Sequence, residues 1–372
     1  MINLMTPIND LGYGVAGLNI LKALQKHTEV ALHVIGQPQA TRKEDIDAVK
    51  KGLETAKSFD HNAPCVKIWH QNQMAERIGS GKFIGFPIFE LDTFTDLEKH
   101  HLRSCDELMV CSQWAKDVVL SNIFPADIPV VHDLFAENIH VVPLGVDTEI
   151  FKPHVSKRPK TIFFNCGKWE KRKGHDILLE CFNRAFRHED DVELWMMCHN
   201  PFIGDHNKEW ENLYKNSPLG DKIRMIPRQK THEDVYNIMK QTDCGVFPAR
   251  AEGWNLELLE MMACGKDVIT TNYSAHTEFC NEKNSFLIDI DSLEPAYDGV
   301  FFTGNHGQWA SFNDSSKSQL VEHMRNVHGV KQQYTNGHDI HFRELTSPNH
   351  AGIETANKFT WENSAKELLN GI

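Results

Sequence analysis

Short apolar runs alternate with stretches of helical spacing along the first 150 residues. The runs have the length and composition of buried strands, whereas the stretches between and after them place apolar residues three or four positions apart. We expect strands at 1–5, 30–36, 64–70, 83–90, 107–112 and 139–145, and helices at 18–27, 92–105 and 113–123. This alternation predicts a parallel sheet with helices on both faces.

A second alternating set follows the polar stretch 146–160, which contains two prolines and has the character of an interdomain linker. We expect strands at 161–167, 192–198, 222–227, 244–249, 267–272 and 285–290, and helices at 174–186, 232–242 and 255–265. Over residues 291–352 the pattern weakens, and we expect one helix at 318–328 among irregular loops. Two α/β sets of similar size predict two facing doubly wound domains, whose ligands bind at the carboxyl ends of the strands in the crevice between the domains.

Composition narrows the class of partner. The chain of 372 residues carries a formal net charge of −12, which disfavours nucleic acid and anionic lipid as partners unless a local basic groove exists. Its nine cysteines are scattered without a C-x-x-C pair, as is typical of free thiols in a reducing cytosol. No apolar run reaches membrane-spanning length, and the N-terminal residues do not resemble a signal peptide. We therefore expect a cytoplasmic protein, of an oligomeric state that the sequence leaves open.

Three glycines, Gly12, Gly14 and Gly17, lie between the first expected strand and the helix after it. Exposed backbone amides at a helix N-terminus can bind an anion. No acidic residue follows at the end of the second strand, where a dinucleotide site requires one. A simple tight turn is the competing interpretation of this loop.

Four cations, Lys168, Lys171, Arg172 and Lys173, lie within six residues between a strand and a helix. Side-chain charge and the helix dipole would together favour a diphosphate at this point. The competing interpretation is a basic loop that faces water.

The stretch 250–265 places glutamates in or beside an apolar helix. Asn255 is expected to cap that helix, with Glu252 just before it and Glu260 one turn inside among leucines and methionines. A carboxylate at position 260 could accept hydrogen bonds from the vicinal hydroxyls of a ribose. The alternative is a satisfied core carboxylate or an exposed one, and we favour that alternative for Glu257.

The same stretch resembles the motif of retaining family-4 glycosyltransferases with the GT-B fold (glycosyl transferases group 1). Glu252 and Glu260 fall on the family's two glutamates, and Lys168 and Lys173 fall on its arginine and lysine. Residues 105–119 and 139–153 are similar to segments that end the family's N-terminal domain, and 359–369 resemble the C-terminal helix that crosses back onto it. The resemblance implies an α/β GT-B fold with two facing Rossmann-like domains. These are an acceptor-side domain at 1–150, joined by 355–372, and a donor domain at 151–354.

The resemblance also implies roles for individual residues. Glu260 would bind the donor's ribose, Glu252 would contact hydroxyls of the donor sugar, and Lys168 and Lys173 would neutralise the departing diphosphate. Further contacts to the donor would come from Gly14, from Arg228 beside the base, and from the backbone amides of Asn255 and Leu256. The family acts without a metal or other cofactor, so we interpret the acids at 45–47 and 289–291 as surface residues. We likewise interpret His338 and His341 as a loop feature rather than a zinc site.

The sequence departs from the family where a donor-binding histidine usually follows the strand near residue 90. Glu90 occupies that place, and Asp92 and His70 are competing candidates for the same role. Lysine replaces arginine at Lys168, which keeps the charge but loses the bidentate geometry, and Asn255 replaces a glycine.

The function implied is retaining hexosyl or pentosyl transfer from a nucleoside diphosphate sugar to an acceptor hydroxyl, with a polysaccharide or lipopolysaccharide-type glycan as the expected acceptor. The alternatives are glycosylation of a hydroxymethylated DNA base and a noncatalytic module that binds nucleotide sugars. Glu90 in place of the family histidine is the main support for the noncatalytic alternative.

Overall fold

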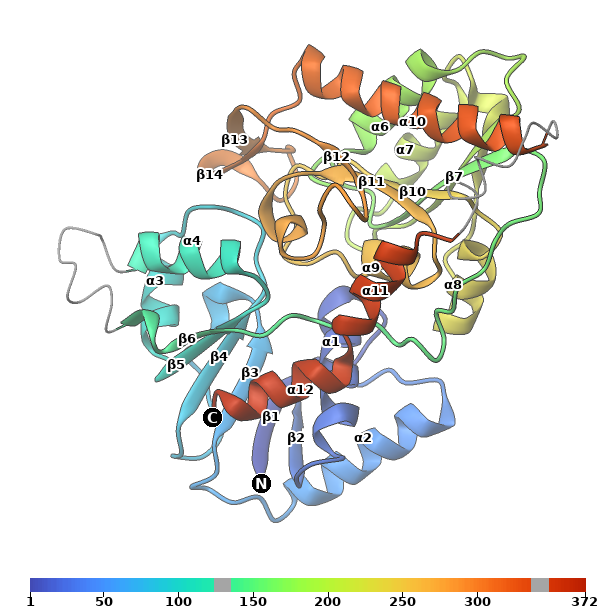
Figure 1. The fold of residues 1–372 in the computed structure, drawn as a ribbon. Helices are drawn as coiled ribbons and strands as arrows, with labels where there is room; N and C mark the ends of the chain where they lie inside the picture. The colour runs from blue at the N-terminus through green and yellow to red at the C-terminus, as the bar shows by residue number, and fades with distance from the viewer. Residues whose placement is uncertain (124–134, 336–347) are drawn as a thin grey trace. The chain divides into compact units, whose positions relative to one another are not determined.

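The computed structural model describes residues 1–123, 135–335 and 348–372. These residues form two compact units (Figure 1). Unit 1 comprises residues 1–145 and 359–372, and unit 2 comprises residues 146–358. The sequence places these boundaries at 150 and 354, close to the observed positions.

Unit 1 is built on a six-stranded parallel sheet with the order β2-β1-β3-β4-β5-β6. The strands are β1 (Ile2–Thr6), β2 (Val30–Val34), β3 (Cys65–Trp69), β4 (Phe83–Pro87), β5 (Glu107–Val110) and β6 (Ile139–Val141). The helices are α1 (Gly12–Leu24), α2 (Lys43–Ala56), α3 (Asp96–Arg103), α4 (Gln113–Ile123) and α12 (Trp361–Asn370), with the short η1 (Gln71–Gln73). Most residues of β3 and β4 are buried, which explains their continuous apolar runs.

The C-terminal helix α12 is part of unit 1 and packs against α1. Its Glu362 pairs with His27 at 2.6 Å, and the Ser364 hydroxyl donates to the Pro143 carbonyl at 2.6 Å. A side chain at Gly145 would collide with the backbone at Trp361. Glycine at position 145 therefore lets the end of the first sheet lie directly against the start of α12.

Contrary to our expectation from the sequence, Asp45 in α2 does not lie on the surface. The acids at 45–47 are expected on the surface, but Asp45 is buried and forms an ion pair with Lys22 of α1 at 2.7 Å. The carboxylate thus joins α1 to α2, and the surface interpretation is wrong for Asp45.

Unit 2 contains a second six-stranded parallel sheet with the order β12-β11-β10-β7-β8-β9. Its strands are β7 (Thr161–Gly167), β8 (Val192–Cys198), β9 (Ile223–Met225), β10 (Cys244–Phe247), β11 (Asp267–Thr271) and β12 (Phe286–Ile288). The helices are α6 (His175–Ala185), α7 (His206–Lys215), α8 (His232–Met239), α9 (Leu256–Ala263), α10 (Asp314–Thr335) and α11 (His350–Lys358), with η2 (Gly220–Lys222) and η3 (Ser274–Glu278). Helices α6 and α10 lie side by side (Figure 1).

The region beyond residue 291 differs from the expectation of one helix among irregular loops. An antiparallel hairpin of β13 (Leu293–Tyr297) and β14 (Thr303–Ala310) precedes α10, which is twice as long as the helix expected there. His338 and His341 lie outside the described residues.

The burial of the cysteines agrees with the sequence-based expectation. All nine thiols are free, and all except Cys105 are buried. Within the described ranges, no helix has both the length and the apolar character needed to cross a bilayer.

Candidate nucleotide-sugar site

The candidate site lies at the carboxyl ends of the strands of the second sheet. Strands β7 and β10 are neighbours and run parallel, so their carboxyl ends meet. The loop after β7 carries Lys168 and Lys173 into α6, and the loop after β10 carries Glu252 into α9. This topology brings together the cations and the first glutamate predicted from the sequence.

Glu252 is held by two cations. Its carboxylate accepts from Arg172 at 2.8 Å and from Lys173 at 2.9 Å, and only 7% of its side chain is exposed. Burial alone would raise the pKa of Glu252, but Arg172 and then Lys173 outweigh it and hold that pKa far below the usual value. Glu252 is therefore an ionised carboxylate.

Two cations of the loop, Lys168 and Arg172, share a second carboxylate, that of Glu170. Arg172 bonds to Glu170 at 2.7 Å, and Lys168 pairs with the same carboxylate at 2.7 Å. Burial lowers the pKa of Lys173, but Glu252 more than compensates and raises it, so Lys173 stays charged. A bound diphosphate would share cations that the protein already neutralises.

Lys168 is the most accessible of the paired cations. About a third of its side chain is exposed, and its ammonium lies 5.7 Å from the centre of the Phe202 ring. Glu170 has no role in the sequence-based prediction. Its position between Lys168 and Arg172 in the sequence is the pattern that indicates a carboxylate shared by the two cations.

Glu257 and Gly167 lie beside Lys173. The Glu257 carboxylate lies 4.0 Å from the Lys173 ammonium. Gly167 has φ = +132°, and an added Cβ would lie 3.1 Å from Lys173 and 3.3 Å from Glu257. Glycine at the end of β7 therefore leaves room for both side chains, and Glu257 lies nearer to the predicted cations than the sequence indicated.

The N-terminus of α9 is capped as predicted. The Asn255 side chain accepts a hydrogen bond from the Leu258 amide at 3.2 Å. The amides of Leu256 and Glu257, in the same first turn, have no acceptor within the helix. These amides and the helix dipole can bind a phosphate.

Glu260 is the carboxylate without a partner. It is 9% exposed, and no described residue donates a hydrogen bond to its carboxyl group or forms an ion pair with it. Burial, and then the charge of Glu257 one turn earlier, raise the pKa of Glu260 well above its usual value. An uncompensated buried carboxyl costs stability, which makes it a candidate for binding a ligand.

Arg228 lies further along the carboxyl ends of this sheet. It follows β9, which is separated from β7 by β8, and its side chain is exposed. Its predicted proximity to the base remains a prediction.

The predicted residues of unit 1 gather at the carboxyl edge of its own sheet. Gly14 is buried in the first turn of α1, where a Cβ would collide with Asn9, so its immediate role is close packing of the loop. Glu90 follows β4 and is half-buried, while His70 follows β3 and is exposed. The hydroxyl of Tyr13 donates to the Ile88 carbonyl and lies 3.2 Å from Nδ1 of His70. Tyr13 is not among the residues predicted from the sequence. Its hydroxyl links the loop that contains Gly12 and Gly14 to the ends of β3 and β4.

Asp92, the other candidate for the role of Glu90, lies two residues further along. Its side chain accepts from the Thr93 hydroxyl at 3.2 Å, and its backbone carbonyl accepts from Asn122 at 2.9 Å. These contacts fix the loop after β4, and the choice among Glu90, Asp92 and His70 stays open.

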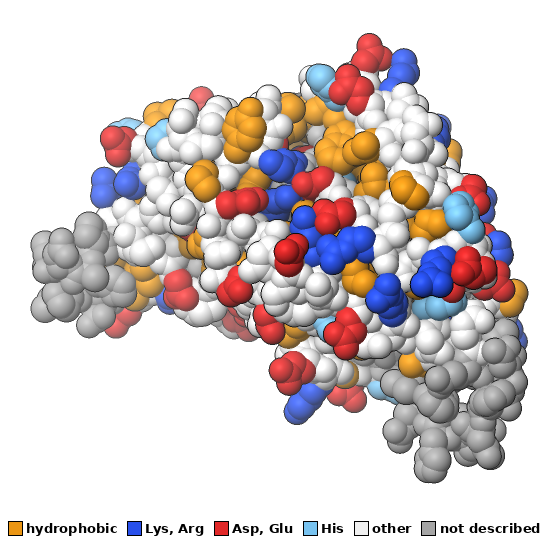
Figure 2. All heavy atoms as spheres, turned by 90° about the horizontal axis from the view of Figure 1, so that it is seen from above, with side chains coloured by type: hydrophobic (Ala, Val, Ile, Leu, Met, Phe, Trp, Pro, Cys, Tyr) orange, Lys and Arg blue, Asp and Glu red, His pale blue; other side chains and the backbone are white. Residues whose placement is uncertain are grey.

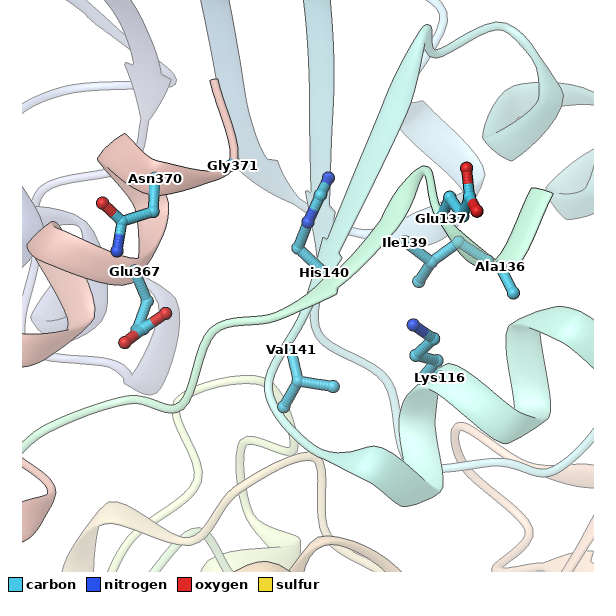
Figure 3. Close-up of a pocket in the computed structure, with 9 residues that line it drawn as sticks. All are labelled: Lys116, Ala136, Glu137, Ile139, His140, Val141, Glu367, Asn370 and Gly371. Carbon is cyan, nitrogen blue, oxygen red and sulfur yellow. The ribbon is translucent and has the colours of Figure 1, made fainter. Parts of the chain in front are cut away.

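A separate cavity in unit 1 has a volume of about 500 Å³ (Figure 3). It is lined by residues of α4, β6 and α12, among them Lys116, His140 and Glu367. None of the residues that line it is a predicted site residue.

Charges of both signs are interspersed on the face shown in Figure 2, where acidic side chains lie beside the lysines and arginines. In the described part of the chain, no three His, Cys, Asp or Glu side chains are grouped as a metal ion would require.

Residues 146–299 match the family model described as glycosyl transferases group 1. Over these residues unit 2 is similar to group 1 glycosyltransferases. The match begins at the first residue of unit 2. It includes residues 168–174, the cation loop that carries Lys168 and Lys173, and also Glu252 and α9 with Glu260.

Similar proteins of known sequence include named glycosyltransferases. The MMP alpha-(1->4)-mannosyltransferase of Mycolicibacterium hassiacum is 25% identical over 185 residues, which cover 50% of this chain and 41% of that protein. Putative glycosyltransferase 45 of Sulfolobus islandicus filamentous virus is 22% identical over 262 residues, covering 68% and 66% respectively. The chain spans about half the length of the curated relatives it matches.

Solved structures resemble the whole chain, with both units included. Sucrose-phosphate synthase from Thermosynechococcus elongatus has a TM-score of 0.67 at 14% identity and covers 99% of this chain and 97% of its own. Anabaena HepE in complex with UDP-glucose has a TM-score of 0.66 at 14% identity, with 100% and 99% covered. These likenesses confirm the predicted GT-B fold.

Proposed function

We propose that the protein is a retaining glycosyltransferase that moves a sugar from a nucleoside diphosphate sugar to an acceptor hydroxyl. The observation that carries this proposal is Glu260, a buried carboxyl group without a partner among the described residues. It lies one turn inside α9, whose first-turn residue Glu257 is 4.0 Å from Lys173 of the cation loop. A ribose would supply the hydroxyl donors that Glu260 lacks. The carboxyl group would then gain two hydrogen bonds to ribose hydroxyls in place of burial without a partner.

The diphosphate would lie between the cation loop and the N-terminus of α9. Lys168 and Lys173 would supply charge, and the amides of Leu256 and Glu257 would supply oriented donors. The attraction between these groups and the leaving group grows as the sugar–phosphate bond breaks, so the same contacts would lower the barrier.

Glu252 would orient the donor sugar. Its ionised state, fixed by Arg172 and Lys173, makes it an acceptor for sugar hydroxyls rather than a proton donor. With front-face attack by the acceptor, the leaving phosphate itself would take the acceptor's proton. Glu90, with His70 and Asp92 as alternatives, would hydrogen-bond a sugar hydroxyl or assist that transfer from unit 1.

A glycan is the acceptor that we propose. The similar proteins include a mannosyltransferase and a sucrose-phosphate synthase, whose names describe a transferred sugar and a sugar product. The net charge of −12 and the interspersed surface charges in Figure 2 favour a glycan over a modified base in DNA. We propose that the protein acts in the cytoplasm and needs no metal or other cofactor.

The test is release of nucleoside diphosphate by the purified full chain from UDP-glucose, GDP-mannose and ADP-glucose, with and without oligosaccharide acceptors and with EDTA present. We expect turnover of one donor, loss of at least 100-fold in Glu252→Gln, and no change in Glu322→Gln, an exposed glutamate on α10. NMR of the product should show the donor's anomeric configuration. Donor binding without turnover on any acceptor would contradict the catalytic proposal and support a noncatalytic binding module.

A further inference from the structure

Two residues beside Glu252 have unusual backbone conformations. Among the described residues, Asn255 and Ser274 are the non-glycine positions with positive φ, at 82° and 54°. This left-handed conformation costs an ordinary residue about 1–2 kcal/mol. Both are held by specific hydrogen bonds, since the Glu252 amide donates to the Ser274 hydroxyl at 2.9 Å and Asn255 caps α9.

His276 lies directly behind Asn255. The Asn255 amide nitrogen is 3.0 Å from Nε2 of His276, and the ring is fully buried. On its other side, Nδ1 lies 2.9 Å from the Thr270 hydroxyl and 3.2 Å from the Thr271 carbonyl. The imidazole therefore connects the end of β11 to the cap of α9.

The hydrogen bonds fix the protonation state of this ring. Because the Asn255 oxygen accepts from Leu258, its NH₂ group must face His276, and Nε2 must accept. The ring proton then lies on Nδ1, where the Thr271 carbonyl accepts it. If Nε2 of His276 were also protonated, its N–H would face the NH₂ group of Asn255, and two donors would meet. Rotating the Asn255 amide by 180° would relieve that clash, but its NH₂ group would then face the Leu258 amide, which is also a donor.

We propose that His276 is a positioning residue for the diphosphate site: its neutral imidazole fixes the Asn255 amide, which in turn holds the first amides of α9 toward the ligand. This inference rests on the proposed function for the identity of the ligand. It also gives asparagine a role at a position where the family motif that the sequence resembles has glycine, because here a side-chain network replaces glycine's freedom at positive φ.

The charged groups around His276 come from two neighbouring loops. Glu252 favours the protonated ring, whereas Lys173 and Arg172 oppose it. Thr270, Thr271 and Asn255 contact it without charge. Burial dominates and lowers the pKa of His276 to about 4, in agreement with the state that the hydrogen bonds require.

The test is a double-mutant cycle with His276→Leu and Asn255→Gly, in which binding of inorganic pyrophosphate, UDP, GDP and ADP is measured by calorimetry at pH 7.5. We expect His276→Leu to weaken diphosphate binding about tenfold when Asn255 is present and less than twofold in Asn255→Gly. His276→Gln, whose amide oxygen can accept from Asn255, should recover most of the affinity. Equal losses in both backgrounds, or no loss, would overturn the proposal.

The same cycle is run on the unfolding equilibrium without ligand, so the inference is tested even if the protein binds no diphosphate. We expect a coupling of about tenfold between the two positions, together with an ¹⁵N spectrum of His276 that shows a neutral ring protonated on Nδ1 at pH 6. Absence of coupling, or an Nε2-protonated ring, would overturn the positioning role. Failure of the wild-type chain to bind any of the four probes would instead contradict the proposed function.

Discussion

Replacing Glu260 with methionine should stabilise the protein and weaken its nucleotide binding. Methionine is flexible and apolar, so it can fill the space of the buried side chain. The substitution removes a carboxyl group that is 9% exposed and has no partner among the described residues. Removing an unsatisfied buried polar group is worth about 1–3 kcal/mol.

The gain is measurable as a melting temperature. For a unit of the size of residues 146–358, each kcal/mol shifts the melting temperature by roughly 2–4 °C, so we expect a rise of about 2–12 °C. In the same variant a nucleoside diphosphate loses two hydrogen bonds from its ribose worth about 1 kcal/mol each, which is a loss of roughly 30-fold in affinity.

Differential scanning calorimetry with and without nucleoside diphosphate measures both effects. The matched control is Glu257→Met on the same helix, which removes a partly exposed carboxylate 4.0 Å from Lys173 and should bring no gain in stability. The reasoning is refuted if Glu260→Met unfolds at a lower temperature than the wild type. Such a result would mean that Glu260 serves the core rather than a ligand.

Three further outcomes follow from the site. Glu252→Gln leaves Arg172 and Lys173 without their shared buried carboxylate and should cost about 3–5 kcal/mol in urea unfolding, and a loss below about 1 kcal/mol would count against the network. Burial lowers the pKa of His175 from 6.5 to about 3, so its stabilising contribution is complete above pH 6.5 and is lost as the pH falls toward 3. Between pH 7 and pH 5 the wild type should therefore lose about 2 kcal/mol more than His175→Gln, and parallel pH profiles would argue against this. Gly167→Ala forces a Cβ at φ = +132° and should lower the free energy of unfolding by about 1–3 kcal/mol. It should also weaken diphosphate binding, and unchanged affinity would show that the ligand does not use the space beside Lys173.

The sequence predicts the sheets well because buried parallel strands are continuous apolar runs. The stretches 161–167 and 192–198 coincide with β7 and β8 for this reason. The hairpin at 293–310 was missed because its strands are largely exposed and its second strand contains two glycines, so neither periodicity nor composition is typical of a strand. Helix α2 was missed for a related reason, since only three of its residues are buried.

The site is predictable in part. The cation loop, the cap at Asn255 and the two glutamates are visible as local patterns, because each depends on residues close in sequence. The pairing of Glu252 with Arg172 joins positions 80 residues apart, and only the parallel packing of β7 and β10 brings them together. The contact between Asn255 and His276 likewise depends on the adjacent strand β11 and leaves no trace in the local pattern.

The central claim is that a nucleoside diphosphate binds between the cation loop and α9, with its ribose on Glu260. Titration calorimetry of UDP, GDP and ADP into the wild-type chain, Glu260→Gln and Glu322→Gln tests it most directly. We expect one of the three to bind the wild type and Glu322→Gln with equal affinity, and Glu260→Gln at least tenfold more weakly. Equal affinity for all three proteins, or no binding of any diphosphate to the wild type, would contradict it.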